Sequence, residues 1–277
     1  MRKLLTIVVL SFSLLSVYAQ ESIKILAIGN SFSEDAVEQY LYELGAATGD
    51  SLVIGNAYIG GCSLETHWNN AVANKKAYKF RKIIGGTKTE YAYTLLDCII
   101  NEDWDYITFQ QVSTMSGIAD SYFPYITHLL KYVKENALNE SVQFVLHRTW
   151  AYAGSSEHPG FANYGKNQLT MYKQIVEATN KVAGAVSISL IIPSGTAIQN
   201  GRTSHIGDNF CRDGYHLSNG LGRFTAACTW YGFFTGKDVT ENPYTPATIP
   251  LPEAEVAKNA ARCAILHPDE IALRIEN

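Results

Sequence analysis

The sequence predicts an α/β protein: a three-layer α/β/α arrangement around a flavodoxin-like, five-stranded parallel sheet. Short apolar runs alternate with longer amphipathic segments along the chain, and each run is apolar on both faces. Strands of that kind are buried on both sides, as in a parallel sheet that helices cover. The length of 277 residues suits one large domain of this class.

Five strands are expected from runs rich in Val, Ile, Leu or aromatic residues: Ile23–Ile28, Leu52–Tyr58, Asp105–Phe109, Val142–Leu146 and Val186–Ile192. Apolar residues at helical spacing predict seven helices: Glu34–Thr48, Glu65–Phe80, Glu90–Asn101, Phe123–Glu135, Lys166–Ala183, Asn219–Phe234 and Glu253–Leu266. The stretch Gly195–Asp208 is expected to be a loop. Sites in such sheets form at the carboxyl ends of the strands, so residues just after each run are the first candidates.

The first 19 residues have the pattern of a secretory signal peptide. Arg2 and Lys3 precede the apolar run Leu4–Tyr18, and small residues end at Ala19, where cleavage is expected. The run is too short for a membrane span of about 20 residues; an uncleaved anchor helix is the alternative. We expect a single domain over residues 20–277, exported to the periplasm or beyond and without stable membrane insertion after cleavage.

Composition excludes several classes of function. The net charge is −4 and no Lys/Arg cluster is present, so a nucleic-acid partner is not expected. The five cysteines form no CxxC pair and no zinc-type cluster with histidine, so a structural metal site is not expected. Their odd number leaves at least one thiol unpaired.

Gly29-Asn30-Ser31 ends the first strand and leaves two interpretations of Ser31. With Glu34 it forms the S-x-x-E pattern of a capping box, in which the serine only starts a helix. A serine here also has its backbone N–H at a helix N-terminus, where a developing oxyanion is stabilised.

A D-x-x-H motif, Asp213-Gly214-Tyr215-His216, lies far along the chain. A serine nucleophile needs a base and a carboxylate that orients the base, and one local segment can supply both. The alternative is that Asp213 caps the following helix and His216 is a surface residue.

Together, the two motifs resemble the SGNH (GDSL-like) hydrolase superfamily, in an uncharacterised secreted bacterial branch. That family has a G-[DN]-S block after the first strand, a Gly after the second, a polar amide after the third and a D-x-x-H near the C-terminus. These blocks occur here in that order. The resemblance implies the SGNH hydrolase fold, with Ser31 as nucleophile, His216 as base, Asp213 as its orienting acid, and no cofactor.

For the oxyanion hole, the resemblance implies the N–H groups of Ser31 and Gly61, with Gly61 favoured over Gly60. The family's usual G-x-N-D block is missing, and the third strand runs into Gln110-Gln111. A Gln amide is the same donor as Asn on a longer arm. We therefore expect Gln110, with Gln111 next, to supply the third donor.

Six other side chains are candidate substrate contacts: His67, Trp68, Arg148, Trp150, Tyr152 and Arg212. The arginines would suit an acidic sugar, whereas His67 and Trp68 could equally be a helix-surface pair. If Gly61 and the D-x-x-H segment converge, Cys62 and Cys211 must approach each other. A disulfide between them is therefore predicted, with two buried thiols as the alternative.

The implied activity is hydrolysis of a carboxylic ester through an acyl-enzyme. Export and aromatic-rich site loops favour carbohydrate esters, either O-acetyl groups or methyl esters of uronic acids. A lipase or thioesterase of the same fold would need a long apolar groove, which the polar strand-end residues do not favour. A non-catalytic carbohydrate-binding protein on the same scaffold would have no need of Asp213 paired with His216.

Overall fold

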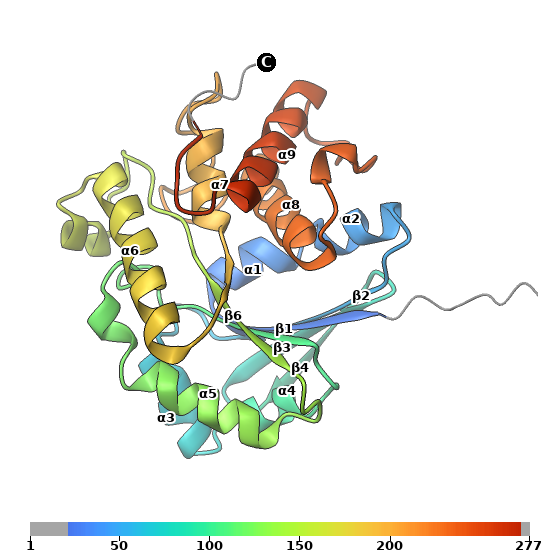
Figure 1. Cartoon of the computed structure of the whole chain (residues 1–277), viewed down its shortest axis with the longest axis vertical. Coiled ribbons are helices and arrows are strands. Elements are labelled where there is room, and N and C mark those ends of the chain that lie inside the picture. The colour runs from blue at the N-terminus through green and yellow to red at the C-terminus, as the bar shows by residue number, and fades with distance from the viewer. Residues whose placement is uncertain (1–21, 273–277) are drawn as a thin grey trace, which may run out of the picture.

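A seven-stranded sheet forms the middle layer of the protein, as seen in a computed structural model that describes residues 22–272 (Figure 1). The predicted signal peptide lies outside the described residues. The strand order is β4-β3-β2-β1-β5-β6-β7. The strands are β1 (Ile23–Gly29), β2 (Leu52–Tyr58), β3 (Tyr78–Ile84), β4 (Thr87–Tyr93), β5 (Tyr106–Phe109), β6 (Gln143–His147) and β7 (Leu190–Ile192).

The five predicted strands are β1, β2, β5, β6 and β7, and all of them run parallel. Their spatial order, β2-β1-β5-β6-β7, is the flavodoxin-like order, so the predicted fold class is confirmed. Strand β7 is shorter than expected because the preceding helix continues to Val186 and ends at Ser187, which has a left-handed backbone.

Strands β3 and β4 form an antiparallel hairpin that extends the sheet beyond β2. The predicted helices Glu65–Phe80 and Glu90–Asn101 were wrong where they overlap this hairpin. Gly85 and Gly86 make its two-residue turn with φ of +56° and +76°, the conformation that favours glycine.

Helices cover both faces of the sheet (Figure 1). On one face lie α1 (Ser31–Val37), α2 (Leu41–Ala47), α7 (Ser194–Gly201), α8 (Leu221–Thr235) and α9 (Leu251–Leu266). On the other lie α3 (Leu64–Val72), α4 (Leu95–Ile99) and α5 (Tyr125–Asn136), while α6 (Gln168–Val186) contributes to both cores. The short 3-10 helices are η1 (Ala119–Tyr122), η2 (Pro159–Tyr164) and η3 (Val239–Glu241).

Strand β1 shows how the sheet separates two hydrophobic cores. Ile25 and Ala27 join the core under α1 and α8, whereas Leu26 and Ile28 join the core under α3 and α5. Successive side chains of a strand point to opposite faces, so an apolar run of this kind serves both cores.

Two helical predictions need correction on the α1 face. The helix expected over Glu34–Thr48 is interrupted at Tyr40, whose φ of +72° separates α1 from α2. The break buries the Tyr40 ring against Phe224, with the ring centroids 5.7 Å apart. Helix α7 occupies the start of the stretch expected to be a loop. Among residues 22–272, no helix is long and apolar enough to cross a membrane.

Candidate active site

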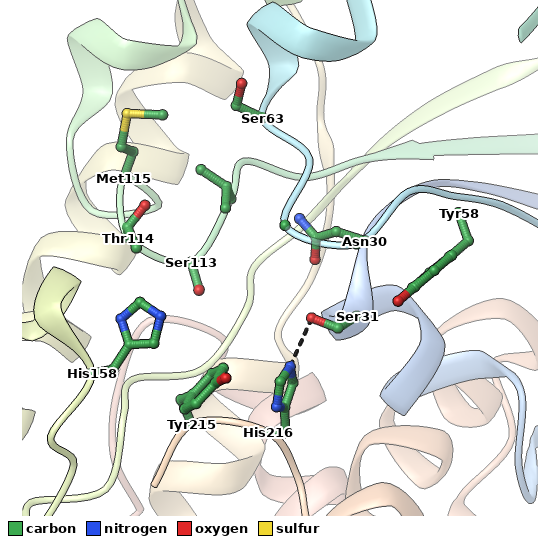
Figure 2. Close-up of a pocket in the computed structure, with 13 residues that line it drawn as sticks. Asn30, Ser31, Tyr58, Ser63, Ser113, Thr114, Met115, His158, Tyr215 and His216 are labelled. Carbon is green, nitrogen blue, oxygen red and sulfur yellow. Dashed lines mark hydrogen bonds between the residues drawn. The ribbon is translucent and has the colours of Figure 1, made fainter. Parts of the chain in front are cut away.

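Ser31 is the first residue of α1, and one residue, Asn30, separates it from the end of β1. The residue that caps this helix is Asn30, whose Oδ1 accepts the N–H of Phe32 at 3.0 Å. The capping-box alternative for Ser31 was therefore wrong, and its hydroxyl is left for another partner. Ser31 Oγ lies 2.9 Å from His216 Nε2 (Figure 2).

His216 and Asp213 come from one tight loop before α8. His216 Nδ1 lies 2.7 Å from Asp213 Oδ2, and Asp213 Oδ1 accepts the N–H groups of His216 and Tyr215 at 2.8 and 3.2 Å. Burial raises the pKa of Asp213, but hydrogen bonds from the His216 ring and these two N–H groups outweigh it and hold the pKa below its ordinary value of 3.8. The carboxylate is thus charged at neutral pH, which fixes the proton on Nδ1 and turns the Nε2 lone pair toward Ser31.

The loop that carries His216 is anchored to α1 through Asp35, which is fully buried. Asp35 Oδ2 accepts the N–H of Leu217 at 2.8 Å. Its Oδ1 pairs with Arg223 at 2.6 Å and with Arg212 at 3.1 Å. Because Asp35 lies on the helix that Ser31 begins, one carboxylate links the serine helix to the histidine loop.

A cavity of about 600 Å³ opens beside Ser31 (Figure 2). It is lined by Asn30, Ser31, Tyr58, Gly60, Gly61, Ser63, Val112, Ser113, Thr114, Met115, His158, Tyr215 and His216. Among residues 22–272, no Asp, Glu, Lys or Arg side chain belongs to this lining. Within the described residues, no group of three or more His, Cys, Asp or Glu is arranged to hold a metal ion.

Gly61 lies at the cavity with a φ of +61°, a left-handed conformation that favours glycine. Among residues 22–272, the N–H groups of Gly61 and Ser31 have no hydrogen-bond acceptor. Asn30 Nδ2 donates to the carbonyl of Cys62 at 2.9 Å and so ties the Gly61 loop to the start of α1. Two unengaged donors at the cavity are what oxyanion stabilisation requires.

Gln110 lies behind the cavity rather than in its lining, so its predicted role as an oxyanion donor was wrong. Its Nε2 donates to Asn30 Oδ1 at 2.8 Å, and its Oε1 accepts from His147 Nδ1 at 2.7 Å. His147 Nε2 accepts in turn from Ser194 Oγ at 3.0 Å. Burial lowers the pKa of His147 to about 3, so the ring is neutral, as this donor and acceptor pattern requires.

Gln111 was also wrongly predicted as an oxyanion donor. Its Nε2 donates to the carbonyl of Ser121 at 2.8 Å, and its Oε1 accepts the N–H groups of Leu64 and Val112 at 3.0 and 2.9 Å. The buried amide therefore holds loops together, as a structural residue does.

His67 and Trp68 lie on α3 and are absent from the cavity lining. His67 is buried, with Nδ1 3.0 Å from the hydroxyl of Tyr78. The Trp68 ring packs on His128, with centroids 4.8 Å apart. Their prediction as substrate contacts was wrong.

Trp150 and Tyr152 are fully buried behind the cavity, so the expectation of direct substrate contact was wrong. Trp150 stacks on Phe32 at 4.3 Å, and its Nε1 donates to the carbonyl of Tyr215 at 2.8 Å. The Tyr152 hydroxyl lies 2.8 Å from Ser113 Oγ. Each ring therefore supports a residue that does line the cavity.

Arg148 and Arg212 offer no cation to an acidic substrate in this cavity, contrary to the prediction. Arg148 is buried and pairs with Asp269 at 2.7 Å. Arg212 pairs with Asp35. Both guanidinium groups are thus engaged by the protein itself.

Cys62 and Cys211 are both free thiols, so the predicted disulfide was wrong. Cys62 Sγ donates to the carbonyl of Ser63 at 3.6 Å, and Cys211 Sγ accepts from Arg202 at 3.6 Å. Burial raises the pKa of Cys62 to about 12 and that of Cys211 to about 11, which keeps both protonated at neutral pH.

Four residues of the site were missed: Asn30, Asp35, His158 and Tyr215. Asn is a preferred N-cap, so Asn30 had a local signal that a competing Ser-x-x-Glu pattern obscured. Asp35 had none, because its bond to Leu217 spans 182 positions. Tyr215 had a local signal, because it lies within the D-x-x-H motif next to His216, whereas His158 reaches the cavity only through the folding of a different loop.

The architecture is that of the SGNH hydrolases. A solved SGNH-type protein from Slackia heliotrinireducens is 18% identical, with 77% of this chain and 99% of that chain covered and a TM-score of 0.50. An acetylxylan esterase from Geobacillus stearothermophilus is 12% identical, with 78% and 95% covered and a TM-score of 0.51. At these identities the likeness concerns the fold.

The chain belongs to the family described as a domain of unknown function, DUF4886, whose model matches residues 24–264. A DUF4886 protein of known crystal structure, from Bacteroides uniformis ATCC 8492, is 51% identical over 91% of this chain and 98% of that chain, with a TM-score of 0.89. No curated protein matches the chain.

Proposed function

We propose that this protein is an exported serine esterase that removes O-acetyl groups from neutral carbohydrate. The proposal rests above all on the hydrogen-bonded line from Ser31 Oγ to His216 Nε2, 2.9 Å, and from His216 Nδ1 to Asp213, 2.7 Å, at the wall of a cavity. A hydroxyl, an imidazole and a carboxylate in this order make a serine nucleophilic at neutral pH.

In the proposed reaction, His216 Nε2 takes the proton of Ser31 as Oγ attacks the ester carbonyl. The N–H groups of Ser31 and Gly61 stabilise the tetrahedral oxyanion. The imidazolium, which Asp213 stabilises, then gives its proton to the leaving alcohol. Water, activated by the same histidine, hydrolyses the acyl-enzyme and restores the serine.

The chemistry of the cavity supports a neutral substrate. A uronic acid chain carries carboxylates, yet no Lys or Arg of the described part of the chain lines the cavity, which disfavours the methyl-ester alternative. Ser63, Ser113 and Thr114 interrupt any apolar groove, which disfavours a long-chain lipase. The esterase from Geobacillus acts on acetylxylan by its name, and the shared fold adds weight by analogy only.

Export belongs to the same proposal and rests on the sequence of residues 1–19. N-terminal sequencing of the protein secreted or released from its host should give a first residue of Gln20. A protein that stays in the cytoplasm and keeps residues 1–19 would contradict the proposed export.

The activity is tested with p-nitrophenyl acetate and then with a panel of acetylated and methyl-esterified polysaccharides, by measuring released acetate and methanol. We expect acetate release from neutral polysaccharides and none from the matched Ser31→Ala variant. Release of methanol without acetate would mean that the substrate is a methyl ester and not an acetyl ester. If no ester is hydrolysed, the proposal that the protein is an esterase is wrong.

A further inference from the structure

His158 is a residue of the cavity that the proposed catalytic steps do not use. It comes from the loop before η2, and its side chain lines the cavity together with Ser31 and His216 (Figure 2). Within residues 22–272, its Nε2 has no hydrogen-bond partner, whereas Nδ1 accepts the N–H of Gly160 at 3.1 Å.

The tautomer of His158 follows from this contact. Because Nδ1 accepts a backbone N–H, its lone pair is used, and a neutral ring must carry its proton on Nε2. Burial, followed by the electrostatic effect of the nearby His216 ring, lowers the pKa of His158, although Asp213 acts in the opposite direction; the lowered pKa favours the neutral ring. His158 therefore offers the cavity one N–H donor and no charge.

The position of this donor is fixed by the packing of its turn. A Cβ on Gly160 would lie 2.3 Å from Thr114 Cγ2, so the turn sits directly on the loop after β5. Asn163 Nδ2 also donates to the carbonyl of Thr114 at 2.9 Å. A donor held in this way loses little entropy when it binds a ligand.

Three rings form one continuous wall: His158 lies 4.6 Å from Tyr215, and Tyr215 lies 4.1 Å from His216, between ring centroids (Figure 2). In the proposed reaction His216 protonates the leaving alcohol, so the oxygen of that alcohol must lie close to the His216 end of this wall. In a carbohydrate ester, that alcohol is the sugar.

We propose that His158 Nε2 and the Tyr215 ring form a sugar subsite, in which the imidazole donates a hydrogen bond to a hydroxyl or ring oxygen of the acetylated sugar. This inference rests on the proposed esterase function and specifies how its substrate is recognised. His158 is accordingly a specificity residue, and an ester without a sugar should not depend on it.

The test is a matched pair of variants that differ by one methylene. His158→Asn keeps an acceptor for the Gly160 N–H, as a preferred cap, but is too short to present a donor at the Nε2 position. His158→Gln can place an amide N–H there. Both are assayed on p-nitrophenyl acetate and on the acetylated polysaccharide that the screen identifies, beginning with acetylated xylan, and thermal unfolding checks that each variant is folded.

Loss of one neutral hydrogen bond should lower kcat/KM of His158→Asn on the polysaccharide about 10-fold, mainly through KM, with hydrolysis of p-nitrophenyl acetate kept within about twofold. His158→Gln should recover most of the loss. If kcat/KM falls equally on both substrates, or on neither, the proposed sugar subsite is wrong. If the wild-type protein hydrolyses neither substrate, the proposed esterase function is wrong, and the subsite is not the cause of the failure.

Discussion

The two halves of the site are built differently. Ser31 stands on a buried layer in which Asn30, Gln110 and His147 are each no more than 2% exposed. The Asp213 side chain, in contrast, is 41% exposed on a surface loop. The serine half is thus part of the core, whereas the histidine half depends on a local turn and on one buried anchor, Asp35. Apart from Ser31 itself, changes in the first half should mainly cost stability, whereas changes in the second should cost activity, with stability lost as well at the buried anchor Asp35.

Removing the reacting groups should have the largest effect in either half. Ser31→Ala and His216→Ala should each lower kcat on p-nitrophenyl acetate by about 10⁴–10⁶, because nucleophile and base act as one unit. The double variant should be no slower than either single one. If the losses in the double variant are additive, Ser31 and His216 do not act as one unit. If Ser31→Ala hydrolyses the ester at an unchanged rate, the proposed mechanism is wrong.

The next effect concerns the orientation of the base. Asp213→Asn should lower kcat by about 10³–10⁴, since the imidazole loses the partner that fixes its proton on Nδ1. Because hydrogen bonds lower the folded-state pKa of Asp213, its contribution to stability is present above the ordinary Asp pKa and is lost as pH falls through the folded value. The difference in Tm between wild type and variant should therefore be constant near neutrality and close only below about pH 4.

Asp35 tests the anchor of the histidine half. Asp35→Asn leaves two arginines without their buried charge and should destabilise the protein by about 3 kcal/mol. Displacement of His216 should also lower kcat about 10- to 100-fold in the folded enzyme. Asp50→Asn is a suitable control, because Asp50 pairs with Lys237 as part of a different contact. A fall in Tm with unchanged kcat would show that Asp35 serves stability alone.

Gln110 tests the serine half and should have the smallest effect on catalysis. Gln110→Met removes the partners of Asn30 Oδ1 and His147 Nδ1, which should destabilise the protein by about 2 kcal/mol. Since the amide does not line the cavity, kcat should fall less than about 10-fold, whereas loss of an oxyanion donor would cost about 10²–10³. Steady-state kinetics with chemical denaturation distinguish these outcomes.

Local patterns explain which parts of the molecule could be predicted. The parallel strands follow from apolar runs, and the D-x-x-H turn is stabilised by bonds within four residues. The β3–β4 hairpin also had a local signal in its Gly85-Gly86 turn and the alternation of Tyr78–Ile84, but a helical interpretation of the flanking segments prevailed.

Side-chain partners across the sheet could not be predicted in the same way. Gln110 follows its strand, as the resemblance required, yet its amide turns toward His147, which comes from the next strand. Spacing along a chain does not reveal which of several nearby donors an acceptor will choose. Arg148 shows the same limit: it follows β6 but extends away from the cavity to Asp269.

The hydrogen bonds that run from Ser194 through His147, Gln110 and Asn30 to the Cys62 carbonyl visit the ends of all five parallel strands in their spatial order. This chain of hydrogen bonds, here called the brace, lies inside the molecule and holds the Ser31 and Gly61 loops at a fixed separation. The wall formed by His158 and Tyr215 belongs to loops outside the brace. Tyr215 also donates its N–H to Asp213 and is therefore tied to the proposed catalytic loop, whereas His158 comes from a separate loop. An exchange of the His158 side chain should therefore change the proposed sugar contact while the brace keeps the gap between Ser31 and Gly61.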